Sequence, residues 1–141
     1  NFRPRLWADR RVAQEAFAEA LALSDIAFIT LDDEQLLHGD SSLDAALERT
    51  MTLTCPELVV KRGALPTLVK VGGQAAEEVP TVPVAKVVDT TAAGDSFAGA
   101  YLAGRLTGLG ATEAAAAGNR LAARVIQHKG AIIAPELMAD F

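Results

Sequence analysis

A loop of small residues that ends in an aspartate, at the expected start of a helix, combines residue types that could carry out chemistry. The loop reads Asp89-Thr90-Thr91-Ala92-Ala93-Gly94-Asp95-Ser96 and lies between an expected strand at 85–88 and an apolar stretch at 97–106. Small side chains let backbone N–H groups approach a ligand, and a helix N-terminus attracts anions. A carboxylate beside such an anion site suits phosphoryl transfer to a hydroxyl. The structural alternative is that these residues are ordinary helix caps and turn residues.

The elements that must position this loop predict an α/β fold. Strands and helices alternate along the chain, which predicts a mostly parallel sheet, and a Gly72-Gly73 pair predicts a hairpin. No internal boundary is expected within residues 1–141. The periodicity of apolar residues predicts helices at 9–23, 33–37, 43–52, 97–106 and 113–127, strands at 26–29, 58–61 and 85–88, and hairpin strands at 67–71 and 75–79.

The composition of the chain excludes several classes of function. Half of its 141 residues are hydrophobic, which permits a sizeable core. A net charge of −5 without a basic cluster argues against a nucleic-acid partner. No apolar run approaches the roughly 20 residues of a membrane span, so no membrane partner is expected. The single cysteine, Cys55, excludes an internal disulfide and fits the cytoplasm, and the two histidines lack the paired spacing of a zinc site.

The small-residue loop resembles the D-T-x-G-A-G-D signature of the ribokinase-like (PfkB) carbohydrate kinases. The resemblance covers essentially the whole chain and implies the C-terminal part of a ribokinase-like three-layer sandwich, with ATP and Mg²⁺ as cofactors. It implies that Asp95 is the catalytic base and contacts the substrate hydroxyl, and that the N–H groups of Ala92, Ala93 and Gly94 form an anion hole. Ala92 stands where the common signature has glycine, and an alanine there predicts a negative φ.

Four residues are candidates for nucleotide binding. Lys61 and Gly63 follow the strand expected at 58–61, and ligands of open α/β sheets bind outside the carboxyl ends of strands. A solvated surface turn is the alternative for this segment. The resemblance implies that Asn119 lies at the edge of the adenine and that Gly130 lies near the nucleotide. The alternatives are an exposed helix residue for Asn119 and a helix C-cap for Gly130.

An acidic segment at 30–34 is the candidate for binding Mg²⁺. By resemblance it occupies the place of an N-x-x-E motif, whose glutamate holds the metal through water, but the asparagine is absent here. Two alignments are therefore open, and they assign the metal to Asp33 or to Glu34. Mg²⁺ keeps several waters and takes one or two carboxylates, so a degraded motif is tolerable. A helix-capping arrangement is the structural alternative.

The opening segment, Asn1-Phe2-Arg3-Pro4-Arg5-Leu6-Trp7, bears on the substrate. It resembles the N-x-R-P-x-L-W segment of 2-keto-3-deoxygluconate kinases, a branch of the same family. A guanidinium pairs bidentately with a carboxylate, and this sugar acid carries one. Arg3 is therefore the candidate for the substrate carboxylate. Asn1 is a second substrate candidate with a structural alternative, and Trp7 is expected to anchor in the core.

These expectations together describe an ATP-dependent kinase in the cytoplasm that phosphorylates 2-keto-3-deoxygluconate at its terminal hydroxyl. The alternatives are a ribokinase-like kinase for a neutral sugar of the fructose or ribose type, and a non-catalytic nucleotide-binding module. The expected partners are a small-molecule sugar acid and ATP, and assembly into a homo-oligomer is left open. Because the chain lacks an initiator methionine and is about half the length of such kinases, it is expected to be a piece of a longer protein.

Overall fold

The computed structural model describes residues 1–138 and has the expected α/β architecture. Its four strands form one mixed sheet in the order β1-β2-β3-β4, rather than a mostly parallel one. The chain divides into two compact units: unit 1 is Asn1–Gly63 with Lys70–Ala76, and unit 2 is Ala64–Val69 with the chain from Glu77 onward. The elements are α1 (Arg10–Ala22), β1 (Ile26–Thr30), α2 (Leu31–His38), α3 (Leu43–Met51), β2 (Glu57–Arg62), β3 (Leu65–Val71), β4 (Glu77–Val79), α4 (Ala93–Leu106) and α5 (Ala111–Val125), with short 3-10 helices at Pro4–Leu6 and Pro135–Met138.

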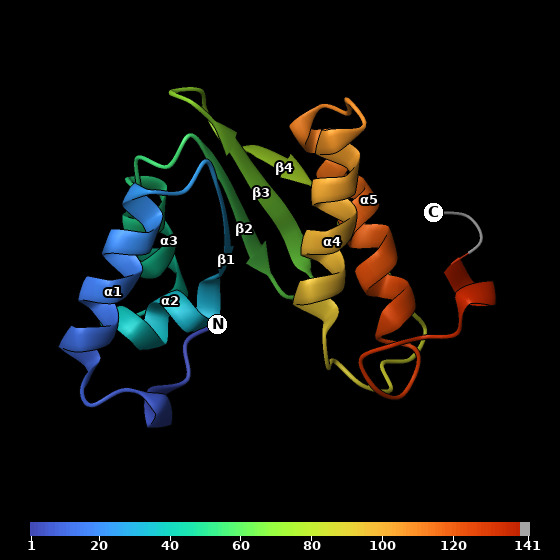
Figure 1. Cartoon of the computed structure of the whole chain (residues 1–141), viewed down its shortest axis with the longest axis horizontal. Coiled ribbons are helices and arrows are strands. Elements are labelled where there is room, and N and C mark those ends of the chain that lie inside the picture. The colour runs from blue at the N-terminus through green and yellow to red at the C-terminus, as the bar shows by residue number, and fades with distance from the viewer. Residues whose placement is uncertain (139–141) are drawn as a thin grey trace. The chain divides into compact units, whose positions relative to one another are not determined.

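Unit 1 is built on the parallel pair of strands β1 and β2. Ile26 pairs with Glu57 and Thr30 with Lys61, so the two strands end side by side. Helices α1, α2 and α3 gather on one side of this pair, and α2 contacts both strands and both other helices (Figure 1). The apolar run 58–60 in β2 is fully buried, as its continuous hydrophobic sequence predicts.

Local capping sets the helix boundaries of unit 1. The Asp9 side chain accepts a hydrogen bond from Val12 N and begins α1, and the Ser42 side chain accepts one from Ala45 N and begins α3. Gly39, with a φ of 74°, ends α2 in the left-handed conformation. The expected helices at 9–23 and 43–52 are confirmed to within one residue at each end. Helix α2 begins two residues before the expected start at 33.

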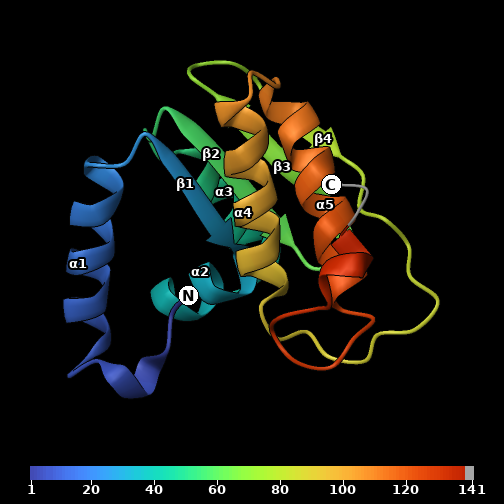
Figure 2. The ribbon, with the colours of Figure 1, turned by 45° about the vertical axis from the view of Figure 1, so that its right-hand side comes forward.

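Unit 2 contains a tightly packed pair of helices. Helices α4 and α5 run antiparallel and side by side (Figures 1 and 2). Two glycines allow this approach: a Cβ on Gly118 would lie 2.7 Å from the Phe97 ring, and one on Gly104 would lie 3.1 Å from Leu109. Phe97 and Tyr101 are buried, and their rings stack with centroids 6.1 Å apart. The two helices are therefore closely packed, and there is no room for an added methyl group at Gly118.

The chain between β4 and α4 differs from the expectation. Strand β4 pairs antiparallel with β3, with Thr67 opposite Val79, which confirms the expected hairpin. The expected strand at 85–88 is wrong, because this segment is not in any strand of the described chain. Its end is held instead by Ile126, whose carbonyl oxygen accepts hydrogen bonds from Val88 N (2.8 Å) and Asp89 N (3.2 Å). A strand needs a ladder of partners, and one carbonyl group does not supply it.

Candidate active site

The small-residue loop of unit 2 turns into α4 through a left-handed residue. Ala92 has a φ of 59° and immediately precedes the first residue of α4. The expectation of a negative φ is therefore wrong: the alanine adopts the conformation for which glycine is normally required. This conformation costs an L-residue roughly 1–2 kcal/mol. The loop is closed by hydrogen bonds from Ala93 N to Thr90 O (3.2 Å) and from Ser96 N to Ala92 O (2.9 Å).

The first turn of α4 brings backbone donors and a carboxylate together. Within residues 1–138 the N–H groups of Ala92, Gly94 and Asp95 make no hydrogen bond, whereas that of Ala93 is used in the turn. Asp95 is the third residue of the helix, is exposed, and has no hydrogen bond or ion pair to the described residues. Unsatisfied N–H groups at a helix N-terminus favour a bound anion. The loop thus combines donors for an anion with a carboxylate able to accept a proton.

Asp89 joins this loop to the turn after α5, a link that the residue types alone did not reveal. One carboxylate oxygen accepts a hydrogen bond from Thr91 N and the other from Gly130 N, both at 2.9 Å. Hydrogen bonds from the Thr91 side chain, Thr91 N and Gly130 N, in that order, lower the pKa of Asp89 to about 2. Gly130, with a φ of 89°, is therefore held by the signature loop itself.

Asn119 lies inside unit 2 as a bridge between elements. Its side chain is buried, and its Oδ1 accepts a hydrogen bond from Thr67 Oγ1 at 3.0 Å. Its Nδ2 donates to the carbonyl oxygens of Val79 (3.3 Å) and Pro80 (3.0 Å). The alternative of an exposed helix residue is wrong. The amide connects α5 to β3 and to the end of β4, and a contact with a nucleotide stays a prediction.

The candidate residues of unit 1 gather where its parallel strands end. Thr30 and Lys61 are register partners at the carboxyl ends of β1 and β2. Gly63 follows with a φ of 63° and open space around its Cα, which a backbone close to a ligand requires. Parallel strands place their following loops at one edge of a sheet, so the acidic segment and the Lys61 segment share that edge within unit 1.

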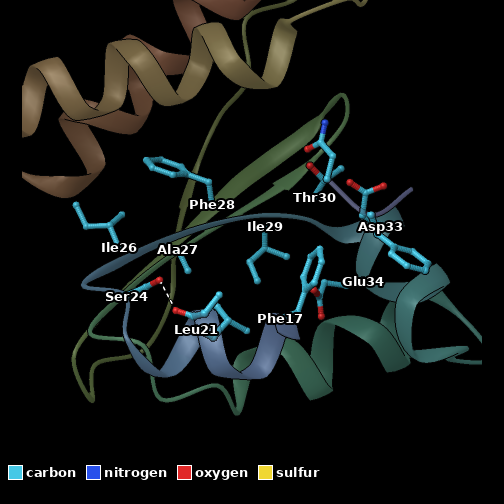
Figure 3. Close-up of a pocket in the computed structure, with 13 residues that line it drawn as sticks. Phe17, Leu21, Ser24, Ile26, Ala27, Phe28, Ile29, Thr30, Asp33 and Glu34 are labelled. Carbon is cyan, nitrogen blue, oxygen red and sulfur yellow. Dashed lines mark hydrogen bonds between the residues drawn. The ribbon is translucent and has the colours of Figure 1, made fainter. Parts of the chain in front are cut away.

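A cavity of about 280 Å³ lies beside β1 in unit 1. Figure 3 shows Ala27 and Ile29 pointing from β1 toward the Leu21 side of the cavity, while Thr30 and Asp33 lie together at one end. Asn1 also lines this cavity, although most of the residue is exposed. The cavity therefore has an apolar wall and a polar end, as a site for a small polar ligand does.

The Glu34 carboxylate is buried and belongs to a cluster of charged side chains. Glu34 is only 5% exposed, and its Oε2 accepts a hydrogen bond from Arg49 Nη1 at 3.0 Å. Arg49 also donates to Asp40 at 2.9 Å, and this bond holds the pKa of Asp40 below its usual value. His38 Nε2 lies 3.6 Å from the same Glu34 oxygen, and burial lowers the pKa of that imidazole. Glu34 is thus used in an internal charge cluster.

Asp33 fits a magnesium ion better than Glu34 does. It is half-buried, lines the cavity, and makes no hydrogen bond or ion pair within the described residues. One such carboxylate together with waters is a normal magnesium environment. The described part of the chain holds no group of three or more metal-ligating side chains, so the protein would supply only part of the coordination.

The opening segment of the chain separates anchoring residues from an exposed cation. Phe2 is buried against Ala13 and Leu37, and Trp7 and Phe17 pack on this cluster, which confirms Trp7 as a core anchor. Arg3 is exposed and has no partner among residues 1–138. The aromatic residues fix the backbone while the guanidinium stays available to a ligand.

Comparison with solved structures first defines a class of protein. The aminoimidazole riboside kinase of Salmonella enterica, solved with aminoimidazole riboside and an ATP analog, has a TM-score of 0.82, with 28% identity over 93% of this chain and 45% of that one. The fructokinase of Vibrio cholerae, solved with fructose, ADP and calcium, has a TM-score of 0.79, with 26% identity over 98% of this chain and 47% of that one. The class is that of small-molecule kinases.

Residues 1–137 match the model of the pfkB family carbohydrate kinases, and the chain belongs to this family. The 2-dehydro-3-deoxygluconokinase of Dickeya dadantii is 49% identical over 140 residues, which are 98% of this chain and 45% of that protein. The chain spans less than half the length of the curated 2-dehydro-3-deoxygluconokinases it matches. In the part that the structure describes, no helix is both long enough and apolar enough to cross a membrane.

Proposed function

We propose that the protein phosphorylates the terminal hydroxyl of 2-keto-3-deoxygluconate with ATP, giving 2-keto-3-deoxy-6-phosphogluconate. The observation that carries this proposal is the exposed Asp95 carboxylate beside the N–H groups of Gly94 and Ala92. The family membership supports a carbohydrate substrate, and the 49% identity to a 2-dehydro-3-deoxygluconokinase supports this particular sugar acid.

In the reaction, the hydroxyl oxygen forms a bond to the γ-phosphorus while the bond from that phosphorus to the leaving ADP oxygen breaks. Asp95 orients the hydroxyl and accepts its proton. The transition state of phosphoryl transfer is loose, so orientation matters more than basicity and an ordinary carboxylate suffices. The free N–H groups of Ala92, Gly94 and Asp95, at the positive end of the α4 dipole, stabilise charge on the transferred group.

ATP and Mg²⁺ are the proposed cofactors, and the metal would neutralise phosphate charge when bound. Asp33 would hold it through water, and Glu34 would keep Asp33 in place through its bond to Arg49. Lys61 and Gly63 would lie against the nucleotide at the ends of the parallel strands. We place the reaction in the cytoplasm, where the single free cysteine would remain reduced.

Two further nucleotide-binding residues of the proposal lie in unit 2. Gly130 would approach the nucleotide by its backbone, in the turn that Asp89 holds. Asn119 would lie at the edge of the adenine. Its buried amide would support the nucleotide site mainly by holding α5 against β3.

The substrate carboxylate is assigned to Arg3. Its guanidinium is exposed and unpaired within the described chain, on a backbone that Phe2 and Trp7 anchor. A planar guanidinium recognises a carboxylate through two parallel hydrogen bonds. Asn1, which lines the cavity, would contact a hydroxyl of the same substrate.

The first test is an assay of ADP release by the full-length protein with 2-keto-3-deoxygluconate, gluconate, fructose and ribose. Turnover of 2-keto-3-deoxygluconate is expected, and Asp95→Asn should lower kcat at least ~100-fold, as for a lost general base. Asp44→Asn is the matched control, because Asp44 is also an exposed acid in the first turn of a helix, and it should leave kcat unchanged. Near-full activity of Asp95→Asn would reject the catalytic assignment.

A kinase for a neutral sugar is the second candidate, favoured by the structural similarity to a fructokinase. Arg3→Met separates the two. It should raise KM for 2-keto-3-deoxygluconate about 10- to 100-fold, the value of a charged bidentate contact, and change KM for fructose little. Arg5→Met, an exposed arginine two residues away, is the control and should change neither. No turnover of any sugar would favour a non-catalytic nucleotide-binding module.

A further inference from the structure

Helix α2 begins differently from the other two helices of unit 1. The Asp9 and Ser42 side chains cap α1 and α3, whereas the Thr30 side chain makes no capping hydrogen bond at the start of α2. The first turn of α2 also carries three consecutive carboxylates, at 32–34. The helix dipole favours each of them, but neighbouring carboxylates repel one another. The first turn of α2 is therefore fixed less firmly by its own residues than the first turns of α1 and α3 are.

Arg49 of α3 binds this first turn at two points. Its Nη1 donates to Glu34 Oε2 at 3.0 Å, and its Nη2 donates to the backbone carbonyl oxygen of Glu34 at 3.3 Å. The same guanidinium binds Asp40, beyond the C-terminal end of α2, through Nη2 at 2.9 Å and Nε at 3.2 Å. A guanidinium makes such bonds in one planar geometry, whereas an ammonium group acts as a point charge. Arg49 therefore fixes both the side chain and the backbone of the residue that follows Asp33.

The contacts of Arg49 connect α2 to the neighbouring helix α3. Glu34 is buried, and a pair shielded from water is screened little by salt. His38 also lies near Glu34, but it belongs to α2 and cannot fix this helix against α3. Toward the other end of α2, Gln14 Nε2 of α1 donates to Leu37 O at 2.9 Å. Helix α2 is thus bound from both neighbouring helices, with Arg49 acting on its first turn.

We propose that Arg49 is a positioning residue for Mg²⁺, which keeps the Asp33 carboxylate at the polar end of the cavity beside β1 (Figure 3). The inference rests on the proposed function, which assigns the metal to Asp33. Asp33 makes no hydrogen bond or ion pair within the described residues, so its orientation depends on the helix that carries it. Residues behind a metal-binding group strongly affect the affinity for the metal. Loss of the two-point contact should therefore weaken Mg²⁺ binding and leave phosphoryl transfer nearly unchanged at saturating metal.

The test is Arg49→Lys in the full-length protein, because lysine keeps the charge beside Glu34 but cannot bind its side chain and carbonyl group in the same geometry. We expect the Mg²⁺ concentration for half-maximal activity to rise about 10-fold, with kcat at saturating Mg²⁺ and KM for 2-keto-3-deoxygluconate within about 2-fold of the wild type. The dissociation constant of Mn²⁺ from the protein with a bound ATP analogue, measured by water-proton relaxation, should rise by the same factor. Arg11→Lys is the matched control, because it alters an exposed arginine–glutamate pair on α1, and it should change none of these values.

A double-mutant cycle separates positioning from stability. Asp33→Asn alone should raise both metal constants. Adding Arg49→Lys to it should raise them further by less than about 2-fold, because the carboxylate that Arg49 positions is already lost. Effects that multiply would overturn the proposal, since Arg49 would then act independently of Asp33. A less stable Arg49→Lys with unchanged metal constants would also overturn it, because Arg49 would then be only structural.

The remaining outcomes distinguish this inference from the proposed function. A wild type that turns over no sugar would overturn the proposed function, whereas Mn²⁺ binding would still decide the role of Arg49. A wild type that binds no Mn²⁺ beside the nucleotide would overturn the positioning role even if sugar is turned over. Should Arg49→Lys not fold, Asp40→Asn loosens the same guanidinium and should raise the Mn²⁺ constant about 2- to 5-fold. An unchanged constant in that variant would overturn the proposal.

Discussion

Unit 1 and unit 2 hold their candidate residues by different physical means. In unit 1 these are side chains, Arg3 and Asp33, which stand beside an aromatic cluster and a buried ion pair between Glu34 and Arg49. In unit 2 they are mainly backbone groups, which depend on a left-handed Ala92 and on the glycine-lined contact of α4 with α5. Side chains recognise a substrate by charge and shape, whereas a rigid backbone cradles a phosphoryl group.

This difference predicts which changes each unit tolerates. The charge cluster of unit 1 contains several partners, so removing one leaves a buried charge partly uncompensated. The helix pair of unit 2 contains almost no spare volume, so adding one methyl group forces atoms to move. Unit 1 should be sensitive to loss of charge and unit 2 to gain of volume.

The largest effect on the free energy of unfolding is expected for Glu34→Gln in unit 1. Removing one member of a buried pair costs about 3–5 kcal/mol, but the Arg49 side chain is 28% exposed and keeps Asp40, so we expect about 2–3 kcal/mol. The matched control is Glu15→Gln, which breaks a pair with Arg11 whose side chains are 64% and 73% exposed, and it should cost about 0–0.5 kcal/mol. Urea denaturation of the full-length protein measures both. Equal effects would mean that the charge cluster does not stabilise unit 1.

A smaller effect is expected for Gly118→Ala in unit 2. The new Cβ would lie 2.7 Å from Phe97, and overpacking costs about 1–3 kcal/mol, which a gain in helix propensity of about 1 kcal/mol reduces. We expect a net loss of about 1–2 kcal/mol. Gly99→Ala in α4 meets nothing within 4 Å and should stabilise the protein by about 0.5–1 kcal/mol. The same sign for the two variants in thermal denaturation would contradict close packing as the cause.

The smallest effect is expected for Ala92→Gly, which sharpens the comparison within the unit 2 loop. Glycine adopts a φ of 59° without strain, but it also loses more freedom on folding, so we expect stabilisation by about 0.5–1 kcal/mol. The converse change is Gly39→Ala in unit 1. It should destabilise the protein by about 1 kcal/mol, because a φ of 74° is unfavourable for alanine and the new Cβ would also meet the flexible Arg10 side chain. A destabilised Ala92→Gly would show that the alanine is not strained.

Features that depend on neighbours in sequence were predicted well. The helices expected at 9–23 and 43–52 and the hairpin around Gly72 follow from apolar periodicity and turn residues a few positions apart, which act over the same short range. The 85–88 segment fails for the opposite reason: its apolar β-branched residues suit a strand, but a strand needs a neighbour that the sequence pattern cannot supply. Apolar patterns predict strand propensity and not strand pairing.

Features that depend on distant residues were decided by the tertiary structure. The different surroundings of Asp33 and Glu34 depend on Arg49, fifteen positions beyond Glu34, which donates a hydrogen bond to the glutamate. The burial of Asn119 depends on Thr67, fifty-two positions away. No local pattern encodes either contact, because the strength of a hydrogen bond depends on distance in space and not in sequence.

The sequence by itself determined the family, the α/β class and the position of Asp95 at the start of a helix, because short motifs and apolar periodicity act through local sterics and hydrogen bonds. Only the tertiary structure decided that Ala92 is left-handed, that Glu34 is committed to an ion pair and that Asp89 bridges to Gly130. These three depend on packing and electrostatic contacts between segments that meet only when the chain is folded. The long-range contacts can impose a strained backbone or select one carboxylate because their energies of one to a few kcal/mol exceed local preferences of about 1 kcal/mol.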